Sequence, residues 1–445
     1  MSVASPPALK VDRPTRKEPA PDSDSLAASI RRRSRDLAWM LFGKFAMTGA
    51  NSALMLLLAW LMEVGNYGLF GLAVGVQLLV SRMVLLGVDQ GMIRLYTVED
   101  LKDRPERVVQ AGLRSTSLLS IPVGVAAVVL ILVGVPDWPW FSLVAVALGS
   151  VGIALFDYAV CVRLARLHYR AAALVQASMP LGRLALTLGA FLIFPNNLES
   201  VFLIYAGSAL LFGSVLSRNC AREAVDLPDR KLIFRLLNYS KWPGSCDIAM
   251  MACLQQGLFL LTYLGMESER GIYTFALTLS MGFFAIFLAF YQTILPRAVR
   301  LESAEELPRY MTKCVLAALL LVLASALVTV VIGLFLPGFL ADIGKPELQG
   351  FALPFYGLAG FMMLLMVEAP LTVACQYLLL PQLALAGMSI RIVLVAAFGL
   401  FLAEDFGAAG TGAAQAAGAA CSLVLYALLV HLAVRRRLRQ AACAE

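Results

Sequence analysis

The sequence predicts an all-α integral membrane protein with about twelve transmembrane helices in two six-helix lobes around a central lumen. Hydrophobic residues make up 60% of the 445-residue chain and charged residues only 15%, against about 25% charged residues in soluble proteins. Apolar windows of about 20 residues, the length that crosses the hydrocarbon core as a helix, recur from end to end. A soluble all-α protein is excluded, because too few polar faces remain to meet water.

The apolar windows give the elements in order. The predicted spans are residues 37–62, 66–95, 109–134, 139–164, 167–194, 199–219, 239–265, 269–296, 308–336, 350–378, 381–403 and 408–434. They divide the chain into a disordered cytosolic tail (1–30), an N-terminal lobe (31–219), a cytosolic linker (220–238), a C-terminal lobe (239–434) and a basic cytosolic tail (435–445). The first tail alternates prolines with charges, which is typical of disorder, and it lacks the apolar core of a signal peptide.

The basic residues predict the orientation. If both termini lie on one side, nearly all lysines and arginines of the loops and tails fall on that side, and the opposite loops hold only Arg270 and Lys345. The positive-inside rule then places both termini in the cytosol. The net charge of +7 therefore belongs to juxtamembrane loops and does not indicate a nucleic-acid partner. Two distant histidines predict no metal site, and eight cysteines, none of them in an outward loop, predict no disulfide framework.

An internal repeat links the two predicted halves. "NYGLFGLA" (66–73) resembles "ERGIYTFA" (269–276), with Gly68 matching Gly271 at an offset of 203 residues. At the same offset, Arg94 in "GMIRLY" matches Arg297 in "ILPRAV". Both copies occupy equivalent points of a six-span half, which predicts a parallel duplication, although chance similarity between apolar helices is an alternative. Transporters built from such halves bind cargo between them.

Several charges lie inside the predicted spans, where each costs about 2.5–3.5 kcal/mol. The basic residues are Lys44, Arg82, Arg183 and Arg391, and the acidic residues are Asp89, Asp157, Asp247 and Glu368. We therefore expect the basic side chains to face a wet cavity, an acidic partner or an anionic cargo. Asp157 lies close to the cytosolic boundary, and a solvated helix end is an equal alternative for it.

The span 66–95 carries charges that a helix surrounded by lipid does not need. Arg82 and Asp89 are seven residues apart, which puts them on one helix face about 10 Å apart along the axis. Direct contact is not expected, so each needs a partner elsewhere, and Gln90 extends their face. Arg94 is interpreted as a cytosolic anchor. The alternative for Arg82 and Asp89 is a structural ion pair with a neighbouring helix.

Two further charges lie beside helix-bending prolines: Pro180 precedes Arg183, and Pro370 follows Glu368. An ordinary kink and a functional hinge are both open. Polar residues that would line the lumen are Gln90, Gln255 and Gln256, although helix packing is equally open for the last two. The small residues of "GAAGTGAAQAAG" (407–418) predict close helix packing.

The outward loops are too short for the site of a membrane enzyme, and no GxxxxGK[ST] motif is present. We therefore predict a protein that is not an enzyme. "EVGNYGLFGLAVGVQLLVSRMVLLGVDQGMIRLY" resembles the signature of the polysaccharide-transport branch of the multidrug/oligosaccharidyl-lipid/polysaccharide exporter superfamily, which includes the Wzx O-antigen flippases. The matching residues are Tyr67, Gly68, Phe70, Leu72, Ala73, Leu86, Gly87, Ile93 and Arg94. Met62 and Glu63 depart from the Gly-Pro-Glu-type turn that is common there.

The resemblance implies a V-shaped bundle in the bacterial inner membrane that moves an undecaprenyl-pyrophosphate-linked oligosaccharide to the outer leaflet. Its implied partners are this lipid-linked cargo, membrane lipid, a polysaccharide polymerase and a chain-length regulator; no cofactor is implied. In this hypothesis the four basic residues attract the pyrophosphate. Asp89, Asp247 and Glu368 balance them or couple transport to protons or sodium. The alternatives are a cation-coupled multidrug exporter of the same superfamily and a non-transporting scaffold of a polysaccharide machine.

Overall fold

A computed structural model describes residues 23–96, 105–134, 138–194, 197–223, 230–298, 306–377 and 380–442. Over these ranges the chain is helical and contains no strand. Eleven of the described helices are long and apolar enough to cross a membrane, so the chain is a multi-pass membrane protein. The predicted all-helical membrane fold is confirmed.

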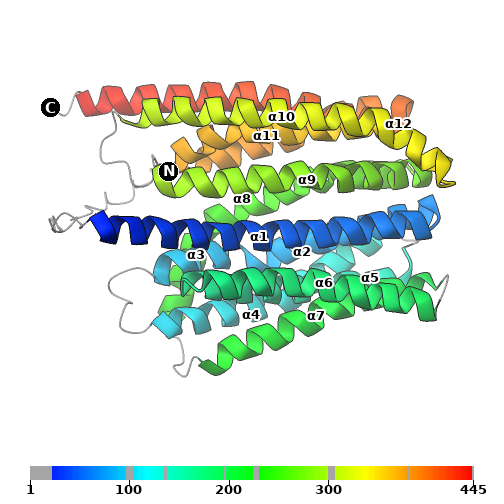
Figure 1. Ribbon diagram of the computed structural model, residues 1–445, viewed down its shortest axis with the longest axis horizontal. Coiled ribbons are helices and arrows are strands. Elements are labelled where there is room, and N and C mark those ends of the chain that lie inside the picture. The colour runs from blue at the N-terminus through cyan, green and yellow to red at the C-terminus, as the bar shows by residue number, and fades with distance from the viewer. Residues whose placement is uncertain are drawn as a thin grey trace.

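The first half contains α1 to α7. Their bounds are α1 (Ser23–Leu61), α2 (Val64–Leu85), α3 (Val88–Tyr96), α4 (Pro105–Gly134), α5 (Trp140–Ala165), α6 (Tyr169–Ile193) and α7 (Leu198–Glu223). The second half contains α8 (Arg230–Tyr263), α9 (Glu267–Ala298), α10 (Glu306–Asp342), the 3₁₀ turn η2 (Pro346–Phe351), α11 (Ala352–Tyr377) and α12 (Pro381–Ala442). α1 begins and α12 ends at the same end of the bundle (Figure 1), which agrees with an even number of crossings.

The predicted count of twelve spans is recovered once α12 is divided. Gly407, with φ 55° and ψ −130°, interrupts α12 and separates it into two segments. They correspond to the predicted spans 381–403 and 408–434. Other boundaries differ more. α8 begins at Arg230, inside the predicted linker, because its charged first turns extend a helix beyond the apolar window. α1 begins at Ser23, inside the predicted disordered tail, whose residues 1–22 lie outside the described part.

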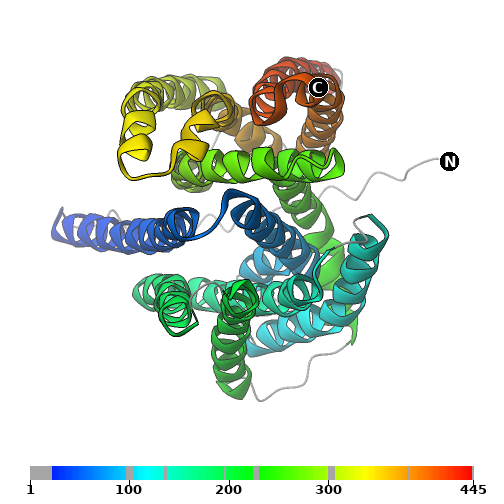
Figure 2. The ribbon, with the colours of Figure 1, turned by 90° about the vertical axis from the view of Figure 1, so that its right-hand side faces the viewer.

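The helices gather into two lobes when the bundle is viewed along its length (Figure 2). α2 to α7 form one lobe and α9 to α12 the other, while α1 lies along the boundary and packs on α6 and α9. α8 crosses this boundary, because it packs against α12 in its own half and against α2, α3 and α4 in the other. The two lobes predicted from the sequence are confirmed, and α8 is the helix that joins them.

The two repeat stretches meet at the lobe boundary, where α2 packs on α9. A Cβ on Gly68 would lie 2.7 Å from the backbone nitrogen of Gly271, and one on Gly71 would lie 2.2 Å from the Thr274 methyl group. Both pairs have the repeat offset (271 − 68 = 203 and 274 − 71 = 203). Each residue therefore faces its own counterpart, as expected at a two-fold axis between duplicated halves.

The predicted span 66–95 is not one helix, which corrects the expectation of a continuous face through Arg82 and Asp89. α2 ends at Leu85 and α3 begins at Val88, with Leu86 at φ 44° and Gly87 at φ 69°. A left-handed residue after the last helical turn is a common helix stop, and glycine adopts it without steric penalty. A Cβ on Gly87 would also lie 2.5 Å from the backbone nitrogen of Gly244 on α8. The break therefore lets α8 approach α2 and α3 closely.

Candidate functional site

Five charged side chains from five helices meet near the break between α2 and α3. We call them the boundary cluster: Lys44 of α1, Arg82 of α2, Asp89 of α3, Asp157 of α5 and Asp247 of α8. All five are half-buried, so they remain in reach of water or a ligand. This is the part of the described structure in which predicted site residues from both halves come together.

Arg82 is held by an ion pair with a neighbouring helix. Its terminal nitrogen lies 2.9 Å from a carboxylate oxygen of Asp157, and the two side chains are 24% and 23% exposed. The structure thus favours the ion-pair alternative for Arg82, and Asp157, which the sequence left as an equal choice with a solvated helix end, is its partner. Because both groups remain partly solvated, we expect the pair to contribute little to stability and to be open to competition.

Asp89 owes its position to the helix break. It lies in the first turn of α3, where the free backbone N–H groups of a helix favour a carboxylate. The thiol of Cys161 on α5 donates to the Asp89 backbone carbonyl at 3.0 Å. The carboxylate oxygen Oδ1 is buried without a hydrogen-bond partner. Asp89 is therefore held in place and has one side-chain oxygen with unused capacity to accept a hydrogen bond.

Asp247 reaches the cluster from α8. The Gln90 amide donates to its carboxylate at 2.7 Å, and Asp247 also interacts electrostatically with Asp89, Arg82 and Asp157. Around this contact the backbones are close, because a Cβ on Gly91 of α3 would lie 3.4 Å from the Ser240 Cβ of α8. Gln90 and Asp247 thus join the two halves of the chain.

Lys44 lies within electrostatic range of Asp157, Arg82 and Asp89. The boundary cluster therefore contains two basic and three acidic side chains. Within the described ranges, no group of three histidine, cysteine or acidic residues has the arrangement of a metal site. The cluster is a mixed polar surface with one more acidic than basic side chain.

Arg183 lies elsewhere, inside the first lobe. It is 2% exposed, and its guanidinium carbon sits 3.9 Å from the centroid of the Tyr205 ring on α7. Its Nε has no hydrogen-bond partner, and no carboxylate in the described part of the chain pairs with it. The stacking on Tyr205 is a cation–π contact, so Arg183 is positioned by an aromatic ring and not by an acid.

Arg391 and Glu368 form a buried ion pair inside the second lobe. They are 1% and 4% exposed, and a terminal nitrogen of Arg391 donates to Glu368. The Arg391 Nε donates to the Ser422 hydroxyl at 3.0 Å, and the guanidinium carbon lies 5.9 Å from the centroid of the Phe361 ring. This pair connects α11 with both segments of α12.

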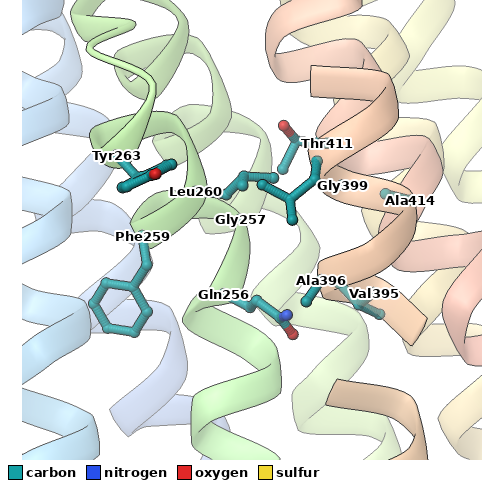
Figure 3. Close-up of a pocket in the computed structure, with 11 residues that line it drawn as sticks. Gln256, Gly257, Phe259, Leu260, Tyr263, Val395, Ala396, Gly399, Thr411 and Ala414 are labelled. Carbon is teal, nitrogen blue, oxygen red and sulfur yellow. The ribbon is translucent and has the colours of Figure 1, made fainter. Parts of the chain in front are cut away.

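The two adjacent glutamines of α8 point to different places. Gln255 is 3% exposed and packs against Gly75 of α2, whereas the Gln256 amide donates to the Ile392 carbonyl of α12 at 2.9 Å. Gln256 borders a cavity of about 240 Å³ between α8 and α12, whose other walls are mostly apolar or small, including Leu260, Gly399 and Ala414 (Figure 3). The structure thus does not place Gln255 and Gln256 in one cavity.

The structure brings together Lys44, Arg82, Asp89, Gln90 and Asp247 and keeps Arg183, Arg391, Glu368 and Gln256 apart from them. Sequence reasoning missed Cys161, since a lone cysteine in an apolar helix carries no signal. Asp157 was recognised as an acid at depth, but nothing in the sequence pairs α2 with α5. The side chains of Arg94, the predicted anchor, and of Arg297, its match in the repeat, lie outside what the structure describes.

No protein-family model and no curated protein sequence matches this chain. Solved structures do match it. An inward-facing multidrug resistance MATE family transporter of the MOP superfamily has a TM-score of 0.59 at 14% identity, covering 88% of this chain and 95% of its own. The lipid II flippase MurJ, in an inward closed conformation, has a TM-score of 0.67 at 9% identity, covering 89% and 87%. A variant of the Vibrio cholerae MATE transporter VcmN has a TM-score of 0.62 at 12% identity, covering 92% and 98%. The chain therefore has the two-lobed fold of these transporters.

Proposed function

We propose that the chain is a flippase that moves an undecaprenyl-pyrophosphate-linked oligosaccharide across the bacterial inner membrane by alternating access, for surface polysaccharide biosynthesis. The observation that carries the proposal is that two basic side chains, Lys44 and Arg82, lie half-buried at the lobe boundary of a transporter fold. The sequence signature around residues 63–96 supports it, as does the likeness to a lipid II flippase. Both termini would be cytosolic, and a polymerase and a chain-length regulator would be partners.

The chemistry of the boundary cluster suits an anionic headgroup that has to be released again. Arginine and lysine make charge-assisted hydrogen bonds to phosphate oxygens. Arg82 already bonds to Asp157, so a pyrophosphate has to compete with this carboxylate and binds less tightly than it would to a free guanidinium. Moderate binding is what a carrier needs, because the cargo also has to be released on the other side of the membrane. Arg183 and Arg391, buried inside the lobes, would then have supporting roles.

A second function, a cation-coupled exporter of small molecules, is favoured by one observation. The boundary cluster holds three carboxylates against two basic groups, and MATE transporters are among the matching structures. In that case Asp89 and Asp247 would bind the proton or sodium ion. Coupling to either ion also remains compatible with a flippase.

Flipping of a fluorescent undecaprenyl-pyrophosphate oligosaccharide in proteoliposomes, read by quenching of the outer leaflet, tests the proposal. We expect Lys44→Met and Arg82→Gln to slow flipping at least about tenfold, since each removes a charge-assisted hydrogen bond worth about 1.5–3 kcal/mol. Lys241→Met is the matched control, because Lys241 is exposed and its contacts with described residues, a bond to Asn238 and the Trp242 ring, lie on its own helix. Wild-type rates for both variants would overturn the proposal. Transport of a cationic dye that depends on Asp89 and not on Lys44 would favour the exporter.

A further inference from the structure

Asp247 differs from the rest of the boundary cluster because it comes from the second half of the chain. Lys44, Arg82, Asp89 and Asp157 lie on helices of the first half and balance in charge, two against two. Asp247, on α8, adds the third acidic side chain. The balance of acidic and basic groups at the cluster thus depends on whether α8 is in place.

The contact that brings Asp247 to the cluster is a close one. Gly87 and Gly91 face Gly244 and Ser240 at backbone distance, and the Leu236 side chain of α8 also lies beside Gly91. Beside this seam stands the 2.7 Å hydrogen bond from Gln90 to Asp247. A charge-assisted hydrogen bond is a sizeable part of such a contact.

We infer that Asp247 occupies, in the unloaded protein, the place that the pyrophosphate of the cargo takes, and that cargo binding releases α8 from α3. The inference rests on the proposed function. A carboxylate and a phosphate are both anionic acceptors, and Asp247 already accepts from Gln90 and interacts with Arg82. A phosphate headgroup that accepts from these donors competes with Asp247 and repels its carboxylate. This repulsion favours the arrangement in which α8 has moved away from α3.

Linkage makes this effect reciprocal. If the α3–α8 contact weakens binding of the anion by some factor, the anion weakens the contact by the same factor. The lobes then separate at the cluster more readily when an anionic cargo is present, and an empty carrier favours the closed contact there. Asp247 acts through the donors that it shares with the cargo and is therefore a positioning residue of the transport cycle.

A disulfide between α3 and α8 measures the contact directly. The Cβ positions of Gly91 and Ser240 are 3.4 Å apart, close to the separation in disulfides. The full-length Gly91→Cys/Ser240→Cys protein in nanodiscs would be oxidised, and the disulfide-linked peptides quantified by mass spectrometry. We expect undecaprenyl pyrophosphate to slow formation of this disulfide about tenfold, while undecaprenol, which has the same chain without phosphate, leaves the rate unchanged.

Variants separate the contact from the charge. Asp247→Ala should slow the oxidation without lipid about tenfold, and Gln90→Ala, at an exposed position, should do the same if the first variant folds poorly. Asp247→Asn keeps an acceptor, so it should retain the disulfide rate and lose most of the response to pyrophosphate lipid. Lys345→Met, which removes the Lys345 to Met62 contact elsewhere between the halves, should leave the disulfide rate and its response to the lipid unchanged.

Two results would overturn the inference alone. One is that undecaprenyl pyrophosphate binds the protein, as measured by native mass spectrometry, but does not slow formation of the disulfide. The other is an Asp247→Asn variant that responds to the lipid like its parent. Absence of any binding of the pyrophosphate lipid to the wild-type protein would overturn both the proposed function and this inference.

Discussion

The buried pair of Arg391 and Glu368 gives the sharpest prediction about stability. Glu368→Leu removes the negative charge together with both acceptor oxygens and leaves a guanidinium that is 1% exposed, with Ser422 and the Phe361 ring as its remaining partners. One terminal nitrogen of Arg391 already lacks a hydrogen bond, so no spare acceptor compensates. Removing one partner of a buried pair costs about 3–5 kcal/mol. The ratio of folded to unfolded protein should therefore fall by about two to three and a half orders of magnitude.

The assay is unfolding by SDS in mixed micelles, followed by circular dichroism and by the reaction of a thiol dye with the buried Cys253 and Cys375. The double variant Glu368→Leu/Arg391→Met removes both charges and should lie within about 1.5 kcal/mol of the wild type. Ser422 keeps its own bond to the Ala419 carbonyl, so no new unpaired hydroxyl arises. The reasoning fails if Glu368→Leu costs less than about 1 kcal/mol, or if the double variant costs the sum of the two single changes.

Three further outcomes are expected. Gly271→Ala would place a Cβ 2.2 Å from a backbone carbonyl of α2, so flipping should fall at least about tenfold. Gly282→Ala on the same helix meets nothing within 4 Å and should keep activity. Equal flipping rates of the two variants would refute the close approach of α9 to α2. Arg183→Met should change the free energy of unfolding by no more than about 1 kcal/mol, because no ion pair is lost; a loss above 3 kcal/mol would indicate an acidic partner. Lys345→Met removes the bond to the Met62 carbonyl at 3.1 Å and should lower the free energy of unfolding by about 1 kcal/mol, as SDS unfolding would show; an unchanged value would mean that the bond does not persist.

Much of the fold could be predicted because hydrophobic length is a strong constraint in a membrane. The windows located the spans, and glycines at equivalent points of the repeat indicated where the halves correspond. The break at Leu86 and Gly87 could not be predicted, because glycine is common inside transmembrane helices and no proline marks the site. The start of α8 was also missed, because charged turns beyond the membrane leave no apolar signal.

The candidate site was predicted in part for a related reason. The sequence gives the depth of a charge in the membrane, but the side of the helix on which it lies depends on packing. Arg82 turns toward the lobe boundary, whereas Arg183 and Arg391, at positions that looked similar in sequence, turn into the interior of their lobes. Their neighbours Tyr205 and Glu368 come from helices whose adjacency only the fold reveals.

The contact between Gly68 and Gly271 has a consequence for the origin of the chain. Residues at the repeat offset face each other there, as the same residue of two subunits does at a two-fold interface. On the predicted duplication, a six-helix ancestor with this surface would have assembled as a homodimer, with both copies using one self-complementary patch. Joining the copies into one chain would then have freed each half to change separately. The helix break beside Asp89 has no counterpart in α9, which is continuous from Glu267 to Ala298. Two identical subunits could not have differed in this way, because both would have had the same sequence at this point.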